Sequence, residues 1–328
     1  MVPKISFKKF IDPKALVPEM NKMAPLHTPV LDLIYPAGVQ INHPMSVVAY
    51  EDIVTKAKNI PLITRGSSSY SLKADGGKFA FIMPQELKPS KFISDATLND
   101  LRALGEGAQK QFALNEVDKL RRATRASKEA LAVQSLTGKI AYPIRNDNGE
   151  FEKFEVSFGT PKKVTLSKKW DDTSYVAASL VADVGKMVAE INKDCNATKF
   201  VGFMDFDTFA AIAKLCMNCG DKLPITVEKD KIIISGVELY ATAETYYDYV
   251  SKKNIPVVQP KFIKVIGVDD GFKFFNCSVD SAEANFQPLP FVVKELRKED
   301  PDGLKLIGNS KPLPAPNADA ICDCQVLK

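Results

Sequence analysis

Four of the six cysteines fall into two close pairs, and closely spaced thiolates can bind zinc or carry out redox chemistry. The first pair is Cys216 and Cys219, in a Cys-x-x-Cys pattern, and the second is Cys322 and Cys324. A structural zinc site takes four ligands, and the sequence has no second Cys-x-x-Cys. Apolar residues at helical spacing around Cys216 favour a buried, reduced thiol, and metal or redox chemistry remains the alternative.

The other common chemical motifs are incomplete. The two histidines, His27 and His43, lie in a proline-rich segment and are too few for a His-rich metal site. Residues 66–69 lack the second glycine of a nucleophile elbow, and Gly77-Lys78 lacks the glycines of a phosphate loop. Gly105 and the glycine two positions later do not follow a strand, as a dinucleotide fingerprint would require. The sequence therefore predicts no catalytic residue, no metal site and no cofactor.

The composition is that of an ordinary globular protein. Of the 328 residues, 45% are hydrophobic and 26% are charged. A net charge of +4 is too small to single out nucleic acid as the partner. No apolar stretch reaches the roughly 18 residues that a transmembrane helix needs. Residues 1–14 lack the apolar core of a secretory signal, so we expect reduced thiols in a cytosol.

Residues 1–45 and 46–92 cannot form a core of their own. The first segment contains seven prolines, which prevent a long helix or a central strand. The second alternates apolar and polar residues as a long β ribbon, which is only marginally stable in water when isolated. We therefore expect both segments to lie on another surface, and the chain to contact copies of itself. The ribbon would contribute five large apolar side chains: Tyr70, Leu72, Phe79, Phe81 and Met83.

A long helix is predicted between a cap at Ser94 or Asp95 and a stop at Gly138, with a break near Gly105. From Leu114 onward, apolar residues recur every three or four positions, which is the helical period. The opposite face is basic, and it is either solvated or directed at phosphates. Its residues are Lys119, Arg121, Arg122, Arg125 and Lys128.

The remaining residues read as strands and shorter helices. Residues 139–144 and 151–158 flank an Asn-Gly turn, which is typical of a β-hairpin. Helices are predicted at 175–191 and from Thr208, with short strands between and after them. Residues 318–327 alternate in polarity, so we expect the end of the chain to lie inside a sheet. Together these elements predict an α+β fold.

The order of these elements resembles that of the tailed-phage major capsid proteins, specifically the lambda-type capsid protein E family with the Hong Kong 97 fold. The likeness covers roughly residues 40–328, and the order and spacing of its short motifs carry it. The two cysteine pairs depart from the family pattern. The motifs are Arg121–Gly138 with its Leu-Thr-Gly end, Phe154–Phe158 followed by Trp170, Val201–Ala213, Phe274–Cys277 followed by Asp280, Asp300-Pro301, and Ser310–Leu313 with the strand to Val326.

The resemblance implies a major capsid protein that self-assembles into the icosahedral head shell of a tailed bacteriophage or prophage, enclosing double-stranded DNA. It implies hexamers and pentamers of the chain, a scaffolding protein or scaffold-protease, a portal protein and an optional decoration protein, with no membrane partner. The location would be the virion capsid, after assembly in the host cytoplasm. The implied domains are an N-terminal arm at 1–45, an E-loop at 46–92, a P-domain with a spine helix at 93–172 and 290–328, and an A-domain at 173–289.

In the implied fold, the ribbon residues make contacts between subunits, and Arg121, Arg122, Arg125 and Lys128 face DNA or a neighbouring subunit. About 94 residues precede the long helix and serve the arm and ribbon, so we expect a separate scaffold rather than a fused one. Two alternatives remain. The first is an encapsulin-like nanocompartment shell, and the second is a cytosolic thiol or zinc enzyme that uses Cys216 and Cys219.

Overall fold

The computed structural model describes residues 6–24, 26–49, 53, 81–145, 148–217, 223–249, 251–282 and 285–328. The chain forms two compact units. Unit 1 comprises Met1–Val48, Met83–Ala132 and Phe274–Pro314, and unit 2 comprises Ala49–Ile82, Val133–Lys273 and Ala315–Lys328. Both units combine helices with β-sheet, so the predicted α+β class is confirmed.

The long helix of the sequence prediction is present, and it is broken at the expected glycine. Helix α5 spans Asp95–Ala103, and the Ser94 hydroxyl caps it by accepting a hydrogen bond from the Thr97 amide at 3.4 Å. Gly105 has a φ of +84°, which residues other than glycine adopt only with strain, and it separates α5 from α6 at Glu106–Ser135. The capping residue at the start, the glycine at position 105 and the helical spacing from Leu114 onward together predict this helical stretch and its break.

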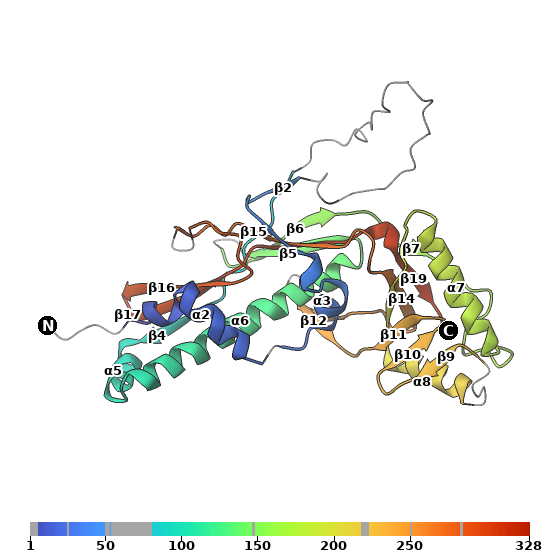
Figure 1. Ribbon diagram of the computed structural model, residues 1–328, viewed down its shortest axis with the longest axis horizontal. Helices are drawn as coiled ribbons and strands as arrows, with labels where there is room; N and C mark the ends of the chain where they lie inside the picture. Colours follow the sequence, from blue (N-terminus) through green and yellow to red (C-terminus); the bar gives the residue numbers. More distant parts are fainter. Residues whose placement is uncertain are drawn as a thin grey trace, which may run out of the picture. The chain divides into compact units, whose positions relative to one another are not determined.

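Unit 1 is built around an antiparallel sheet of β4 (Ser90–Ser94), β16 (Val292–Glu299) and β17 (Asp302–Asn309), with β17 in the middle. Figure 1 shows these three strands side by side next to α5 and α6. One face of the sheet forms a core with α5, α6 and the first residues of the chain. The buried members include Phe7, Leu16, Ile93, Leu98, Leu101, Leu114, Val117, Leu120, Leu304 and Leu306.

The N-terminal segment is more helical than its prolines suggested. Its described residues form α1 (Lys8–Ile11), α2 (Pro13–Lys22) and α3 (Pro29–Ile34). Pro13 and Pro29 begin their helices, where the missing N–H costs nothing. Helix α2 continues through Pro18, and no helix among the described residues of this segment exceeds ten residues. A three-stranded sheet of β1 (Gln40–His43), β15 (Lys273–Cys277) and β18 (Pro312–Ala315) follows.

Unit 2 contains a sheet whose described strands run in the order β7-β19-β14-β8-β11-β10-β9. Helix α7 (Ala178–Asn192) packs against β14 and β19, and α8 (Phe206–Cys216) packs against β9. The strands are β7 (Lys162–Lys163), β8 (Phe200–Met204), β9 (Ile225–Val227), β10 (Lys231–Ile234), β11 (Val237–Ala241), β14 (Phe262–Gly267) and β19 (Ile321–Gln325).

Shorter pairings complete the described structure. The predicted hairpin is confirmed as β5 (Lys139–Arg145) with β6 (Phe151–Ser157), and a second hairpin joins β12 (Thr245–Asp248) to β13 (Lys253–Pro256). Short strands β2 (Val48–Ala49) and β3 (Phe81–Ile82) form a two-stranded sheet. Gly138 closes the turn that follows α6 with a φ of +77°, and a side chain there would collide with the Gly159 carbonyl oxygen.

The last strand lies inside the sheet of unit 2, as predicted. β19 pairs with β14 on one side and with β7 on the other. The alternating residues Ala320, Cys322, Cys324 and Val326 are all at most 1% exposed. The Trp170 amide donates to the Val326 carbonyl at 2.8 Å, which fixes the strand beyond its end. Among the described residues, no helix is long and apolar enough to cross a membrane.

Candidate functional site

The cysteines are packing residues where the structure describes them. Cys195, Cys277, Cys322 and Cys324 are buried and unpaired by disulfides, whereas Cys216 is half-buried on α8. Desolvation raises the pKa of Cys277 and of Cys322 to about 12, so both thiols stay protonated at neutral pH. Cys219 lies outside the described residues. In the described ranges, no three His, Cys, Asp or Glu side chains are placed to hold a metal ion.

The basic residues of α6 do not form one exposed row. Arg121 donates to Asp118 at 2.8 Å and to the Ala24 carbonyl at 2.9 Å, and Arg122 donates to Asp118 at 2.8 Å. Partial burial raises the pKa of Asp118, but the combined effect of the two arginines outweighs it, so the pKa is lowered overall. Of the four proposed DNA- or neighbour-facing residues, Arg122 has the most exposed side chain, at 47%. Arg121 and Arg125 contact the N-terminal segment instead.

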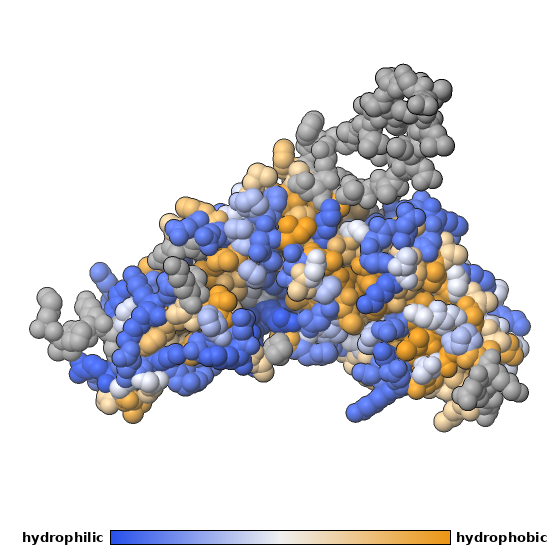
Figure 2. Space-filling view, viewed as in Figure 1, coloured by the Kyte–Doolittle hydropathy of each residue, from blue (hydrophilic) through white to orange (hydrophobic). Residues whose placement is uncertain are grey.

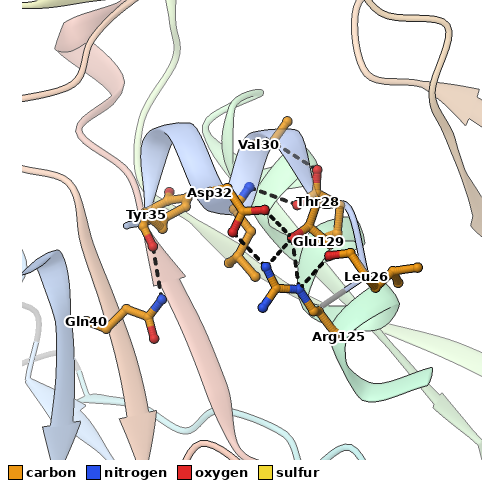
Figure 3. A network of polar contacts seen from close by, with 9 residues as sticks. Leu26, Thr28, Val30, Asp32, Tyr35, Gln40, Arg125 and Glu129 are labelled. Atoms are coloured by element: carbon orange, nitrogen blue, oxygen red, sulfur yellow. Dashed lines mark hydrogen bonds and ion pairs between the residues drawn. The ribbon is translucent and has the colours of Figure 1, made fainter. Parts of the chain in front are cut away.

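Arg125 and Glu129 hold the N-terminal segment on α6 through a network that we call the arm clasp (Figure 3). The clasp comprises the side chains of Thr28, Asp32, Arg125 and Glu129. Arg125 donates to the Thr28 hydroxyl at 2.7 Å, to Asp32 at 2.6 Å and to the Leu26 carbonyl at 3.0 Å. These bonds join positions more than 90 residues apart in sequence.

The buried carboxylate of Glu129 caps the start of α3. Its two oxygens accept hydrogen bonds from the Val30 amide at 2.9 Å and the Leu31 amide at 2.8 Å. The first amides of a helix have no partner within the helix, and their partial positive charge favours a carboxylate. Sequence reasoning missed Glu129, because one acidic residue on a long helix carries no signal of its distant partner.

Lys128 is buried between α6 and the strand region of unit 1. Its ammonium donates to the Pro290 carbonyl at 2.8 Å and to the Asn276 side chain at 3.3 Å, and it lies 5.7 Å from the centre of the Phe274 ring. Burial, with a smaller contribution from Arg125, lowers the pKa of Lys128 to about 7. Lys128 is therefore a structural group within the single chain.

We expect Lys128 to make the free energy of unfolding depend on pH. Between about pH 7 and 10.5 the unfolded chain binds a proton that folded Lys128 has lost, so stability rises with pH across this window. The slope that one proton contributes is at most about 1.4 kcal/mol per pH unit. Urea unfolding at several pH values should show a shallower slope for Lys128→Met than for the parent.

The control for this measurement is Lys119→Met, because Lys119 is on the same helix with 67% of its side chain exposed. It should keep the parent slope. Equal slopes for Lys128→Met and the parent would contradict the assigned titration.

The described part of the ribbon exposes large apolar side chains. Phe81 is 65% exposed and Met83 is 55% exposed. Tyr70, Leu72 and Phe79, the other members of the predicted set, lie outside the described residues. Exposed apolar side chains next to each other are costly in water unless a partner covers them.

A second apolar surface, which sequence reasoning missed, lies on α8 and β9. Phe206, Met217 and Val227 are 51%, 82% and 44% exposed, and Figure 2 shows hydrophobic side chains on the part of unit 2 that carries these elements. Among the described strands, β9 is also at the edge of its sheet. An open apolar edge is a site for pairing with another chain. The β-branched run at Ile225–Val227 is the sequence signal that could have identified it.

The chain is similar to known capsid proteins in sequence and in structure. The family described as phage major capsid protein E matches residues 12–326. A prophage protein of E. coli CFT073 assigned as a capsid protein has a similar structure, with a TM-score of 0.51 at 17% identity over 75% of this chain and 78% of that chain. The capsid of an empty GTA particle gives 0.48 at 15% identity, over 93% and 92% of the two chains. No curated protein matches the chain.

The family match covers nearly the whole chain, and the similarity to the prophage protein confirms the Hong Kong 97-type capsid fold. The match confirms the predicted structural role, in which copies of the chain form a shell, over the alternative of a thiol or zinc enzyme. The chain belongs to the phage major capsid protein E family and is a major capsid protein of the virion shell.

Proposed function

We propose that this capsid protein builds its shell from hexamers and pentamers around double-stranded DNA, in the host cytoplasm. The family match over residues 12–326 supports an assembly role for the chain as a whole. A scaffolding protein or scaffold-protease and a portal protein are the proposed assembly partners, with a decoration protein as an optional one. Contact with DNA is non-specific in this proposal, because the phosphate backbone carries no sequence information.

The domain map remains part of the proposal: an arm at 1–45, an E-loop at 46–92, a P-domain at 93–172 and 290–328, and an A-domain at 173–289. The spine helix of the P-domain corresponds to α6, and the A-domain contains most of the seven-stranded sheet described above. The compact units divide the chain differently, because residues 133–172 join unit 2 and residues 274–289 join unit 1. A domain defined by its role in a shell can include residues from both compact units.

The exposure of Phe81 and Met83 at the end of the ribbon is the observation that carries the proposal. Each large apolar side chain gains about 1.5–3 kcal/mol when it is fully buried. In a shell every subunit has neighbours, so the same contact repeats over the whole lattice. Ribbon side chains that are exposed in a single chain are therefore suited to binding an adjacent subunit.

Negative-stain electron microscopy of the purified protein, with and without a co-expressed scaffold, tests the proposal. We expect closed shells, or hexamers and pentamers that convert to shells. Nuclease-protected double-stranded DNA should copurify when the packaging proteins are present. Shells that enclose protein cargo and no nucleic acid would instead indicate a nanocompartment. A chain that stays monomeric at high concentration, with scaffold present, would contradict shell assembly.

We expect Arg122 to contribute to DNA retention, because its guanidinium is the most exposed of the four candidate cations. Removing one phosphate contact should lower the slope of log affinity against log salt by about 0.9. Filled shells of Arg122→Gln should accordingly release DNA at lower salt than the parent shells. Release can be followed by a dye that binds free DNA during a salt titration.

Arg102→Gln is the matched control, because Arg102 is an exposed cation at the end of α5. It should retain DNA as the parent does. Identical release curves for Arg122→Gln and Arg102→Gln would show that the exposed face of α6 is merely solvated.

A further inference from the structure

The sheet of β4, β17 and β16 in unit 1 has a second face, on the side opposite the hydrophobic core. Strand register places three cross-strand rows on it: Lys294 with Ile307 and Ser90, Leu296 with Lys305 and Phe92, and Lys298 with Gly303 and Ser94. Its strand residues include three lysines and no acidic side chain. We call Lys294, Leu296, Lys298, Lys305 and Phe92 the lysine face.

The lysine face is uncompensated within the single chain. Throughout the described ranges, Lys294, Lys298 and Lys305 form no ion pair within 4.0 Å, although Arg297, on the core side of the same strand, pairs with Asp95. Leu296 is 49% exposed and Phe92 is 36% exposed, so apolar surface lies among the charges. Phe92 lies over Gly303, where an added side chain would come within 2.6 Å of its ring. A face of this kind fits a partner that is acidic and also partly apolar.

The end of the same hairpin has the opposite charge. Glu299 is the last residue of β16, Asp302 is the first of β17, and Asp300 and Pro301 connect them. All four are exposed, and within the described residues none of the three carboxylates forms an ion pair. We call Glu299, Asp300, Pro301 and Asp302 the acidic tip.

In the described structure, the acidic tip forms no ion pair with the lysine face of its own chain. Both belong to β16 and β17, and the ladder between these strands runs without interruption from Val292–Asn309 to Glu299–Asp302. A continuous two-stranded ladder does not fold back on itself, so the tip projects beyond the face. The middle of the face is therefore open to the acidic tip of another copy of the chain.

We propose that the acidic tip of one copy of this chain docks on the lysine face of a second copy. Three carboxylates meet three ammonium groups, and Pro301 contacts the apolar surface of Leu296 and Phe92. The contact is heterologous, because tip and face are different surfaces, so it propagates around a ring that closes when the rotation permits. The inference rests on the proposed shell and names one contact that links its subunits.

Salt dependence is a built-in property of this contact. Exposed ion pairs are individually weak, and the Debye length is about 10 Å at 0.1 M ionic strength. The contact should therefore direct association at low salt and weaken at high salt. Association through the ribbon or through α8 and β9 rests on apolar burial, which salt does not screen.

Charge reversal with rescue tests the proposal in the full-length chain. The face-reversed variant is Lys298→Glu with Lys305→Glu, the tip-reversed variant is Glu299→Lys with Asp302→Lys, and the combined variant carries all four changes. The matched control is Lys163→Glu with Lys229→Glu, two exposed lysines of unit 2. Sedimentation velocity measures self-association, electron microscopy scores shells, and circular dichroism verifies folding, each at low and high salt.

We expect each single-surface reversal to raise the concentration needed for assembly by about tenfold at low salt, and the combined variant to return to within about threefold of the parent. The control should behave as the parent. A combined variant no better than the single reversals, or reversals that assemble like the parent, would overturn the docking while leaving the shell intact. Loss of bound DNA in the face-reversed variant alone would assign the face to nucleic acid and also overturn it. If the parent forms no shell, the result counts against the proposed function. Sedimentation then still tests the docking: salt-sensitive self-association supports it, and a chain that stays monomeric excludes it.

Discussion

Replacing residues 66–78 with a short Gly-Ser linker is expected to abolish closed shells while leaving the subunit folded. The described cores of both units lie outside this segment, so its loss removes none of their buried residues. It removes Tyr70 and Leu72, which the proposed function places in contact with an adjacent subunit. At about 1.5–3 kcal/mol for each of the two large side chains, the loss per contact is comparable with the whole binding free energy of a weak, millimolar complex. Circular dichroism and electron microscopy of the same sample check both halves of this expectation.

Point variants in the described residues sharpen the experiment. Phe81→Ser with Met83→Ser should weaken assembly without changing the unfolding midpoint, because both side chains are already exposed in the single chain. Leu104→Ser is the control, since Leu104 is 68% exposed at the break between α5 and α6. Loss of folding together with assembly would mean that the ribbon belongs to the core of its own subunit. Normal shells would mean that the ribbon is a surface loop that assembly does not need.

Glu129→Ala is expected to cost about 3 kcal/mol of unfolding free energy, since it removes two hydrogen bonds from a buried carboxylate. The Val30 and Leu31 amides would then be left without their acceptor at the start of α3. Urea unfolding measures the loss, and limited proteolysis near residues 24–34 reports release of the N-terminal segment. The unfolding free energy of Glu129→Gln should lie between those of the parent and Glu129→Ala, because an amide has one acceptor oxygen in place of two.

Glu106→Ala provides the comparison for the arm clasp. Glu106 is on the same helix and its side chain is 70% exposed, so water screens its ion pair with Lys9 and the pair should contribute little to stability. If the two alanine variants lost the same stability, the arm clasp would have no special role. Arg125→Gln should share the protease sensitivity of Glu129→Ala, which separates its role from that of Arg122.

Local patterns in the sequence were sufficient for the regular elements. The spacing of apolar residues identified α6, the Asn-Gly turn identified the hairpin of β5 and β6, and alternation identified β19. Each signal lies within a few residues of the element that it predicts. The order of the same elements was also sufficient to indicate the capsid family.

The same local patterns could not predict contacts between side chains that are far apart in the sequence. The basic residues of α6 looked alike in sequence, yet Arg125 bonds to Thr28 and Asp32, Lys128 is buried against Asn276, and Arg122 remains largely exposed. Proline spacing excluded long helices in the arm but could not predict that short ones would pack on α6. Nothing local distinguishes a cation that binds its own chain from one that is free for a partner.

The buried cysteines can report how often each unit of the chain opens. A maleimide or similar reagent modifies a thiol only when its surroundings open and the thiolate forms, so the labelling rate of a buried cysteine measures local opening. Cys277 lies in unit 1, whereas Cys195, Cys322 and Cys324 lie in unit 2. Mass spectrometry of labelled peptides would therefore time the opening of each unit separately, in free subunits and in assembled particles, without introducing any foreign group beforehand.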